Sequence, residues 1–424
     1  MEFATPGIVE LVAAGIFALA LLHTFSTKQF EHLAHVHPRH AGLLHLLGEV
    51  EVVFGFWAMV LLLFMAVHLN TKEALAYLES RNFTEPAFVL VIMVIAASKP
   101  VLDISAATLQ YVSRIFPIRE PIAYYTTILS IGPLLGSFIT EPAAMTLSAL
   151  LLRERFLNRN APASFMYATI GVLFVNVSIG GTLTPFAAPP VLMVAERWGW
   201  DIGFMLSTFG WKAAIAVGVN AVGAAFVFRS YLSKQREAPP GLPTLETPVL
   251  VIAIHLAFLI GVVVFSHHPF VFGALFLFFL GYCDAYKRHQ SKLMLREGLM
   301  VAFFLAGLVV IGGMQAWWLQ PLLAGMDANT LFVGATLLTA IVDNAALTYL
   351  GSLVEGITDE LKYSLVAGAV TGGGLTVIAN APNPAGFALL KDSFEEGAIS
   401  AVGLAVAATI PTLIAAAAFM LLPG

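Results

Sequence analysis

Apolar runs separated by short polar segments follow one another along almost the whole chain. Most of these runs are long enough to cross a bilayer, because a helix of about 20 apolar residues spans the hydrocarbon core. The pattern predicts an all-α polytopic membrane protein. The predicted segments are 7–24, 43–69, 85–112, 122–152, 163–193, 201–232, 248–265, 269–284, 298–318, 329–355, 362–390 and 398–421.

Two of these segments carry an acidic residue in the middle of the apolar run, Glu141 in one and Asp343 in the other. A carboxylate at membrane depth costs about 2.5–3.5 kcal/mol even on the gentler insertion scales, so it normally faces the protein interior and has a function. The neighbouring residues match as well, because EPAAMT ends at Thr146 and DNAALT ends at Thr348. This repetition predicts two homologous halves.

A glycine-rich interruption follows each acidic segment. It reads GGTLTPFAAPP in the first half and GGGLTVIANAP in the second, and both fit the pattern GGxLTxxAxxP. Glycine and proline destabilise a helix interior, so we expect two broken helices. The alternative, that these residues only kink continuous helices, leaves the matched pair unexplained. The expected breaks contain Gly180, Gly181, Gly372, Gly373 and Gly374.

The two halves are 1–232 and 248–424, joined by the polar, proline-rich linker 233–247. Each half then has five transmembrane spans and one segment with a central acid. If 122–152 and 329–355 are re-entrant hairpins, each half crosses the membrane an odd number of times, and the second repeat has inverted topology. Inverted repeats with broken helices at the midplane are the usual architecture of a secondary transporter.

The basic residues agree with this topology. Most of the 21 Lys and Arg residues fall on the side of the linker, and the positive-inside rule makes that side cytoplasmic. We therefore expect both termini outside a bacterial-type inner (plasma) membrane. The scaffold spans are expected within 7–112 and 248–318, the broken helices at 163–193 and 362–390, and the last spans at 201–232 and 398–421.

The two acids suit a hard cation. Sodium takes oxygen ligands, which carboxylates, hydroxyl groups and unwound backbone supply. Burial raises the pKa of a carboxylate, so a proton and sodium can compete for one site. We expect Asp343 to carry the ion and the proton, Asn344 to be an oxygen ligand or tip cap, and Glu141 to be the partner. Further polar contacts are expected from Thr146, Thr348, Thr184, Thr376, Asn380 and Asn383.

Structural roles remain open for several of these residues. Asp343 also suits the N-cap of a helix, and Glu141, which precedes a proline, suits a first helical turn. Lys99 and Asp103 stand four residues apart, so they form either a compensated pair or a counter-charge to the transported ion.

Four histidines lie between the first two spans with the spacing HxxHxHxxH. A solvated loop, a pH-sensing loop and a zinc site all remain open, and no metal beyond the transported cation is predicted. The sequence has no P-loop, nucleophile elbow or HExxH motif, so we expect neither ATP-driven transport nor an enzyme, and no cofactor. The histidines are His32, His35, His37 and His40.

Four stretches resemble the ion transporter superfamily, and within it most closely the NhaD-type sodium/proton antiporters. AIVDNAALT (Ala340–Thr348) is similar to the SAIVDNVPL hairpin tip of that family. AGAVTGGGLTVIANAPN (Ala367–Asn383) resembles its AGTGGSILIIGSAA break, and NVSIGGTLTP (Asn176–Pro185) resembles its NAGGAWSPIG segment. HLLGEVEVVFGFWAM (His45–Met59) is similar to its HxGExxE stretch. The first tip departs from the family, because it has Glu-Pro where NhaD-type proteins have Asp-Asn, which indicates a divergent branch.

The resemblance implies a transporter that exchanges cytoplasmic Na+ (or Li+) for H+ by an elevator-like motion, with the scaffold spans forming a homodimer. It also favours Glu49 as a charged partner over Glu51, which lies on another face of the same helix. The expected partners are the lipid bilayer, a monovalent cation, a proton and a second copy of the chain. No nucleic-acid partner is expected.

Two other functions remain open. The first is Na+- or H+-coupled transport of a small anion, of the carboxylate or arsenite type, which would rely on Lys99 or Lys212. Buried acids repel an anion, and neither tip has the Ser-Asn-Thr of the related carboxylate transporters. The second is a non-transporting membrane sensor or scaffold that acts through the histidines, which leaves the buried acids unexplained.

Overall fold

The structure is a computed structural model that describes residues 6–157, 161–237, 245–394 and 398–423, and its regular secondary structure is entirely helical. The first half contains α1 (Ile8–Val36), α2 (Ala41–Leu47), α3 (Val50–His68), α4 (Thr71–Glu79), α5 (Thr84–Ala96), α6 (Lys99–Ser113), α7 (Glu120–Ile139), α8 (Glu141–Arg155), α9 (Ala163–Gly180), α10 (Pro189–Trp198), α11 (Ile202–Met205), α12 (Trp211–Val227) and α13 (Arg229–Leu232). The second half contains α14 (Val249–Val264), α15 (Pro269–Ala285), α16 (Leu295–Gly312), α17 (Ala316–Ala324), α18 (Ala328–Thr339), α19 (Asn344–Ser352), α20 (Asp359–Gly372), α21 (Asn383–Leu390) and α22 (Ala401–Leu421).

Seven helices or continuous helical stretches of the described chain are long and apolar enough to cross a membrane, and the bent pair α5–α6 makes an eighth candidate. The helices α14, α15 and α18 are also apolar but shorter, with 16, 17 and 12 residues. The prediction of an all-α polytopic membrane protein is therefore confirmed, and the chain is an integral membrane protein.

One predicted span is wrong in its shape. The segment 85–112 is not a single straight helix, because α5 and α6 meet at an angle of 65°. Pro100 lies in the first turn of α6. Proline has no amide hydrogen to donate to the preceding turn and suits the first turn of a helix, so α5 ends and a new helix starts in another direction.

The predicted histidine loop also needs a correction. Helix α1 continues to Val36, well beyond the predicted end of the first span, so His32 and His35 lie in a helix. No glycine or proline interrupts this stretch before Pro38, which explains why the helix continues. Only the last two histidines of the motif lie outside α1.

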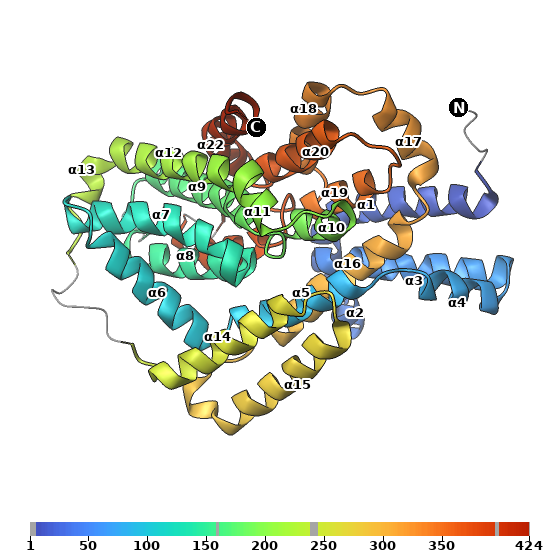
Figure 1. Ribbon diagram of the computed structural model, residues 1–424, viewed down its shortest axis with the longest axis horizontal. Coiled ribbons are helices and arrows are strands. Elements are labelled where there is room, and N and C mark those ends of the chain that lie inside the picture. The colour runs from blue at the N-terminus through green and yellow to red at the C-terminus, as the bar shows by residue number, and fades with distance from the viewer. Residues whose placement is uncertain (1–5, 158–160, 238–244, 395–397, 424) are drawn as a thin grey trace.

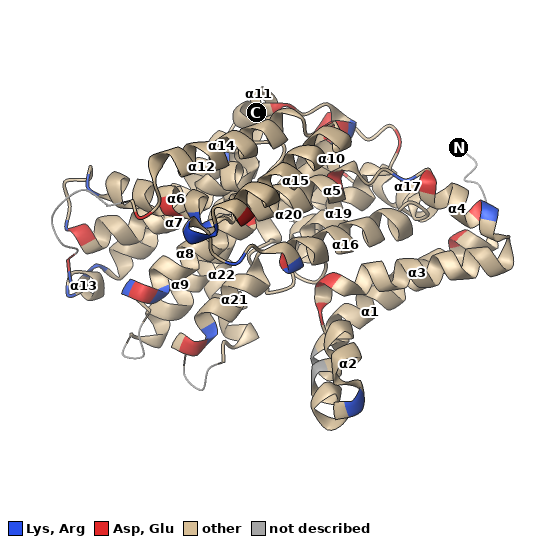
Figure 2. Ribbon diagram, turned by 90° about the horizontal axis from the view of Figure 1, so that it is seen from below, with Lys and Arg blue, Asp and Glu red and all other residues tan. Residues whose placement is uncertain are grey.

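The helices pack into two groups (Figure 1). In the scaffold group, α16 packs against α3 and α5, and the pair α14–α15 packs against α5. In the core group, α9 packs against α7, α12 and α22, while α18 packs against α20. The scaffold group runs along one side of the molecule, and α1, α2 and α3 project from its body (Figure 2).

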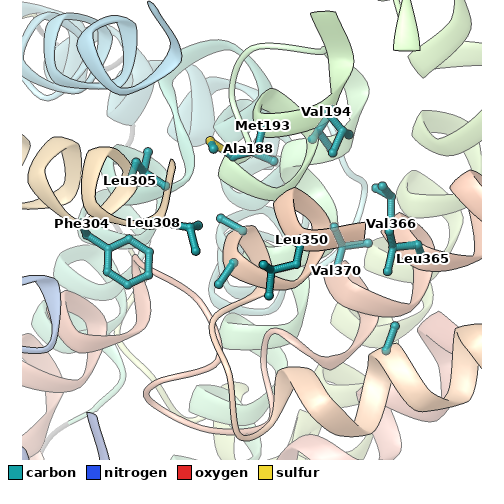
Figure 3. Close-up of a cluster of buried hydrophobic side chains, with 14 of the residues drawn as sticks. Ala188, Met193, Val194, Phe304, Leu305, Leu308, Leu350, Leu365, Val366 and Val370 are labelled. Atoms are coloured by element: carbon teal, nitrogen blue, oxygen red, sulfur yellow. The ribbon is translucent and has the colours of Figure 1, made fainter. Parts of the chain in front are cut away.

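A buried hydrophobic cluster joins the two groups (Figure 3). Leu305 and Leu308 of α16 belong to the same cluster as Leu350 of α19, Val194 of α10 and Val366 of α20. Lipid tails are as apolar as these side chains, so the cluster stabilises the contact through close packing more than through transfer out of water. In this conformation the cluster brings side chains of α10 and α19, which we count with the core group, together with side chains of α16 of the scaffold group.

Candidate ion-binding site

The first acidic segment folds as two helices that pack against each other, with a turn of one residue between them. Helix α7 ends at Ile139, α8 begins at Glu141, and only Thr140 lies between them. Thr140 has a φ of 71°, the single positive value at a non-glycine residue of the described chain. Such a backbone costs on the order of 1–3 kcal/mol. Pro142 follows in the first turn of α8, where its fixed φ suits a helix start.

This turn places Glu141 in the interior, with no exposed surface. Its Oε2 accepts a hydrogen bond of 2.9 Å from Nδ2 of Asn380, which lies in the second glycine-rich break. Its Oε1 has no hydrogen-bond partner among the residues that the structure describes. A Cβ on Gly181, in the first break, would collide with this carboxyl group. We call the turn at Thr140 and Glu141 the first tip, and the turn at Asp343 the second tip. Glu141 therefore lies where the first tip meets both glycine-rich breaks.

The second acidic segment also breaks at its acid. Asp343 is the N-cap of α19, and its Oδ1 accepts hydrogen bonds from the amides of Ala345 and Ala346 at 2.8 and 3.2 Å. The N-cap role proposed from the sequence is therefore present. Asp343 as a whole is partly exposed, and no hydrogen bond of the described residues reaches its Oδ2. Asp343 can cap α19 and offer its second oxygen to a ligand.

Asn344 is oriented differently from its neighbour. Its backbone amide donates to the carbonyl of Ala379 in the second break, at 3.1 Å. Its side chain is completely buried, and neither Oδ1 nor Nδ2 has a partner in the described chain. A buried amide without protein partners is rare in a native protein, and a bound ion or water molecule commonly satisfies such a group.

Matching threonines attach each break to its own tip. Thr184 Oγ1 donates to the carbonyl of Ser137 at 2.5 Å, and Thr376 Oγ1 donates to the carbonyl of Ala340 at 2.9 Å. The helices α9 and α20 end at Gly180 and Gly372, so these hydroxyl groups meet carbonyl groups near the tips. Both breaks therefore make the same type of contact with the preceding acidic segment.

Asn383 stabilises the second break from its far end. Its Nδ2 donates to the carbonyls of Gly373 and Thr376, at 2.7 and 2.8 Å, and its Oδ1 is buried without a partner. The side chain thus takes the place of the helical hydrogen bonds that the break lacks.

A small cavity of about 30 Å³ lies beside the second tip. Three polar side chains line it, from three parts of the fold: Asp343 of the second tip, Glu51 of α3 and Asn380 of the second break. Its remaining lining is apolar, and includes Val301 and Phe304 of α16. A space of this size holds one or two water molecules, so it also suits a largely dehydrated monovalent cation.

Asn380 connects the cavity to the first tip. Its Nδ2 binds Glu141, while its Oδ1 has no partner. The carboxylate charge of Asp343 is close enough to repel those of Glu141 and Glu51. None of the ion pairs in the described chain includes any of these three acids. Acids arranged in this way need protons or a mobile cation to be stable in an apolar setting.

Of the ligands predicted besides Asp343, Asn380 lines this cavity, whereas seven others do not: Glu141, Asn344, Thr146, Thr348, Thr184, Thr376 and Asn383. Thr348 Oγ1 donates to the carbonyl of Ala345 within its own helix, at 3.2 Å, and such i−3 bonds are a common structural use of threonine. Thr146 Oγ1 is buried without a partner. Both threonines lie along their helices, beyond the turn that carries the acid.

The predicted pair Lys99–Asp103 is present and lies at the start of α6. The two side chains are 2.8 Å apart, and Lys99 also meets Glu246, at the end of the linker, at 3.0 Å. Thr247 Oγ1 donates to Asp103 at 2.5 Å. Neither Lys99 nor Asp103 lines the cavity beside Asp343, so the geometry favours the compensated pair.

Glu49 and Glu51 have different environments, as their spacing predicts. Glu49 precedes α3 and forms an ion pair with Arg296 at the start of α16, whereas Glu51 lines the cavity. Sequence reasoning placed Glu49 nearer the site and left Glu51 out. The order of apolar and polar residues does not show which of the two glutamates faces the site, because the fold decides which face of α3 meets the second tip.

Comparison with known proteins points to the same chemistry, the binding of a monovalent cation and a proton, through the family that the chain matches. Residues 8–422 match a family model described as "Putative Na+/H+ antiporter". The search of curated proteins finds no match.

Proposed function

Because the chain belongs to this antiporter family, and is therefore a transporter and not an enzyme, we propose that it exchanges Na+ or Li+ for H+ by alternating access. The observation that carries the proposal is the pair of acids that line the cavity, Asp343 and Glu51, with Glu141 joined to the cavity through Asn380. None of these three acids has an ion-pair partner among the described residues. Cation/proton exchange is the activity that the family indicates, and the acids supply a site for it.

The exchange rests on competition for the same oxygen atoms. Sodium would bind Oδ2 of Asp343 together with the carboxylate of Glu51 and Oδ1 of Asn380, all of which are oxygen ligands suited to a hard cation. When sodium leaves, the like charges of the acids favour the uptake of a proton by one of them. Either species removes one negative charge from the site, so the site crosses the apolar interior at lower cost with a bound sodium ion or a bound proton than with neither.

Glu141 would act as the second acid of the site. Asn380 donates to its carboxylate and faces the cavity with its other end, so a change of charge at Glu141 is transmitted to the Asp343 cavity through one amide. This arrangement supports a role in holding a proton, because Glu141 is completely buried and the cost of an unpaired charge there is high.

The packing supports two inverted repeats with hairpin tips. Helix α10, beyond the first break, packs against α19 of the second tip, and α21, beyond the second break, packs against α8 of the first tip. These reciprocal contacts are what two inverted halves would make. We propose that α7–α12 and α18–α22 move as one unit against the scaffold group. The proposed homodimer rests on the likeness to NhaD-type proteins, and the proposed orientation rests on the distribution of Lys and Arg.

Small-anion transport is the weaker candidate. Lys99 is already bound to two acids, so Lys212 is the remaining cation for such a role. Lys212 is buried and donates to the hydroxyl of Tyr363 at 3.0 Å. It does not line the cavity beside Asp343, where the acids would repel an anion.

The test uses purified protein in liposomes with an imposed pH gradient. Sodium, lithium or potassium is added, and the internal pH is followed. Parent protein should dissipate the gradient with sodium or lithium, and Asp343→Asn should abolish the response. Asparagine is as good an N-cap as aspartate, so this variant keeps the cap of α19 and removes the charge.

Asp327→Asn is the matched control. Asp327 is also an N-cap, at the start of α18, where its Oδ1 accepts from the amides of Asn329 and Thr330 at 3.0 Å, and it is exposed to solvent. This variant should exchange as the parent does. A parent protein that is folded but responds to none of the three cations would overturn the proposal and favour assays of anion uptake.

A further inference from the structure

A second cavity lies away from Asp343, at the end of the molecule opposite the linker. It measures about 470 Å³. The start of α5, the end of α10 and the segment after α14 form its walls. Because α14 begins beside the linker and ends at this cavity, the cavity opens on the face opposite the linker. We call it the vestibule.

Acidic groups dominate the charge of the vestibule. Glu85, Glu196 and Asp201 line it, together with His267. The carboxyl groups of Glu85 and Glu196 are close enough to repel each other when both are charged, and His267 Nδ1 lies 3.6 Å from Glu196 Oε1. No lysine or arginine is among the lining residues. A cleft with one sign of charge and low-dielectric walls concentrates ions of the opposite sign.

Two further cavities continue from the vestibule toward Asp343. Phe186 and Leu192 line both the vestibule and a space of about 10 Å³ at the first tip. Val301 and Ala381 line both that space and the cavity beside Asp343. The three cavities therefore form a row, separated by two pairs of apolar residues.

The middle cavity contains an oxygen atom without a partner. Thr140 lines it and is only 2% exposed, and its Oγ1 has no hydrogen-bond partner in the described part of the chain. A buried hydroxyl group without a partner is costly. Its position between the vestibule and the ion site makes it a ligand for a cation that has left most of its water behind.

We propose that this row of cavities is the path between bulk water and Asp343 for the transported monovalent cation, and that Phe186 and Leu192 close it in this conformation. The inference rests on the proposed function. The vestibule is large enough for a hydrated ion, whereas the middle cavity has room for about one water molecule and the cavity beside Asp343 for about one or two. The ion therefore loses most of its hydration at Phe186, and the oxygens of Thr140, Asn380 and the acids replace it.

The first test labels the vestibule in a Cys283→Ala background, which removes the one native cysteine. Ser266→Cys places a thiol in the vestibule, and Thr71→Cys is the control at the exposed start of α4 on the same face. A membrane-impermeant cationic thiol reagent is added to liposomes that exchange sodium for protons. Exchange should be lost by all Ser266→Cys molecules whose vestibule faces the reagent, and should be unchanged for Thr71→Cys.

The second test examines the barrier without measuring transport. A thiol at Thr140→Cys should be protected from the same reagent in detergent when Phe186 is present. Adding Phe186→Ala should speed its modification about tenfold, which corresponds to about 1.4 kcal/mol of easier opening.

The outcomes separate the path from the function. The path is wrong, and the proposed function stands, if the parent exchanges sodium and fully labelled Ser266→Cys exchanges it equally well. The path is also wrong if Thr140→Cys stays protected from the reagent after Phe186→Ala is added. If the parent in the same background exchanges no cation, the proposed function itself fails.

Discussion

Glu141 and Asp343 occupy matching positions in the two halves, but the structure holds them differently. Glu141 is completely buried and is bound by Asn380. Asp343 caps its own helix and faces a cavity with its free oxygen. The residue that follows each acid explains part of the difference. Asn344 has an amide that binds the second break, whereas Pro142 has no amide hydrogen to donate and instead starts α8 immediately after Thr140.

Two copies of one motif can thus acquire separate roles. A short turn with proline buries the first acid among the breaks, and a longer turn leaves the second acid open to a ligand. We therefore assign ion binding chiefly to Asp343 and a supporting, proton-holding role to Glu141.

The largest expected effect separates the two acids in transport. Asp343→Asn should reduce sodium-driven proton movement in liposomes to the level of empty vesicles. Glu141→Gln should lower the rate about tenfold, because glutamine keeps an oxygen for Asn380 but holds no charge, and a hydrogen bond to a charged group is worth about 1.5–3 kcal/mol. The opposite order, with Glu141→Gln inactive and Asp343→Asn active, would exchange the two assignments.

A smaller effect concerns pH. If one proton competes with sodium at Asp343, the apparent KM for sodium should rise as pH falls, by about tenfold per pH unit once the site is mostly protonated. At high pH the KM should become constant. Initial rates at several sodium concentrations and pH values measure this dependence.

The Glu141→Gln variant sharpens the same measurement. It should keep a slope that corresponds to one competing proton, because Asp343 is unchanged. A slope that disappears in this variant would show that Glu141, not Asp343, is where proton and sodium compete.

Local sequence signals indicate where helices are interrupted, but they do not indicate the long-range contacts. Acids, glycines and prolines inside apolar runs mark positions where a helix is interrupted, so the positions near Glu141, Asp343, Gly180 and Gly372 could be identified from the sequence. The contact between Asn380 and Glu141 spans 239 residues, and no local pattern encodes it.

The same limit applies to the scaffold group. The spacing of Lys99 and Asp103 predicts their pairing, but Glu246 joins them only because the linker ends beside α6. Similarly, Glu51 and Glu49 look alike in the sequence. Their different environments depend on where α16 and the second tip pack against α3.

Substitution of the matched threonines compares how much each contact between a break and its tip contributes to the free energy of unfolding. Thr184→Val and Thr376→Val each remove one hydrogen bond to a carbonyl near a tip. Thr184 is 2% exposed and Thr376 is partly exposed. Thr184→Val should therefore cost about 1–3 kcal/mol by leaving a buried carbonyl unsatisfied, and Thr376→Val should cost less. Thermal unfolding in detergent gives the order, and equal effects would contradict it.

The smallest expected effect compares the turns themselves. Thr140 has a φ of 71°, a conformation that glycine adopts without the steric cost that a side chain adds. Thr140→Gly should therefore stabilise the protein by about 1 kcal/mol, after the extra backbone entropy of glycine, about 0.5–1 kcal/mol, is subtracted from the strain relieved. Val342 holds the corresponding position in the second tip and is not among the residues with positive φ. Val342→Gly should lower the unfolding temperature, because it relieves no strain and removes a side chain that packs against the core. If Thr140→Gly lowers the unfolding temperature as much as Val342→Gly, strain in the first turn does not distinguish the two tips.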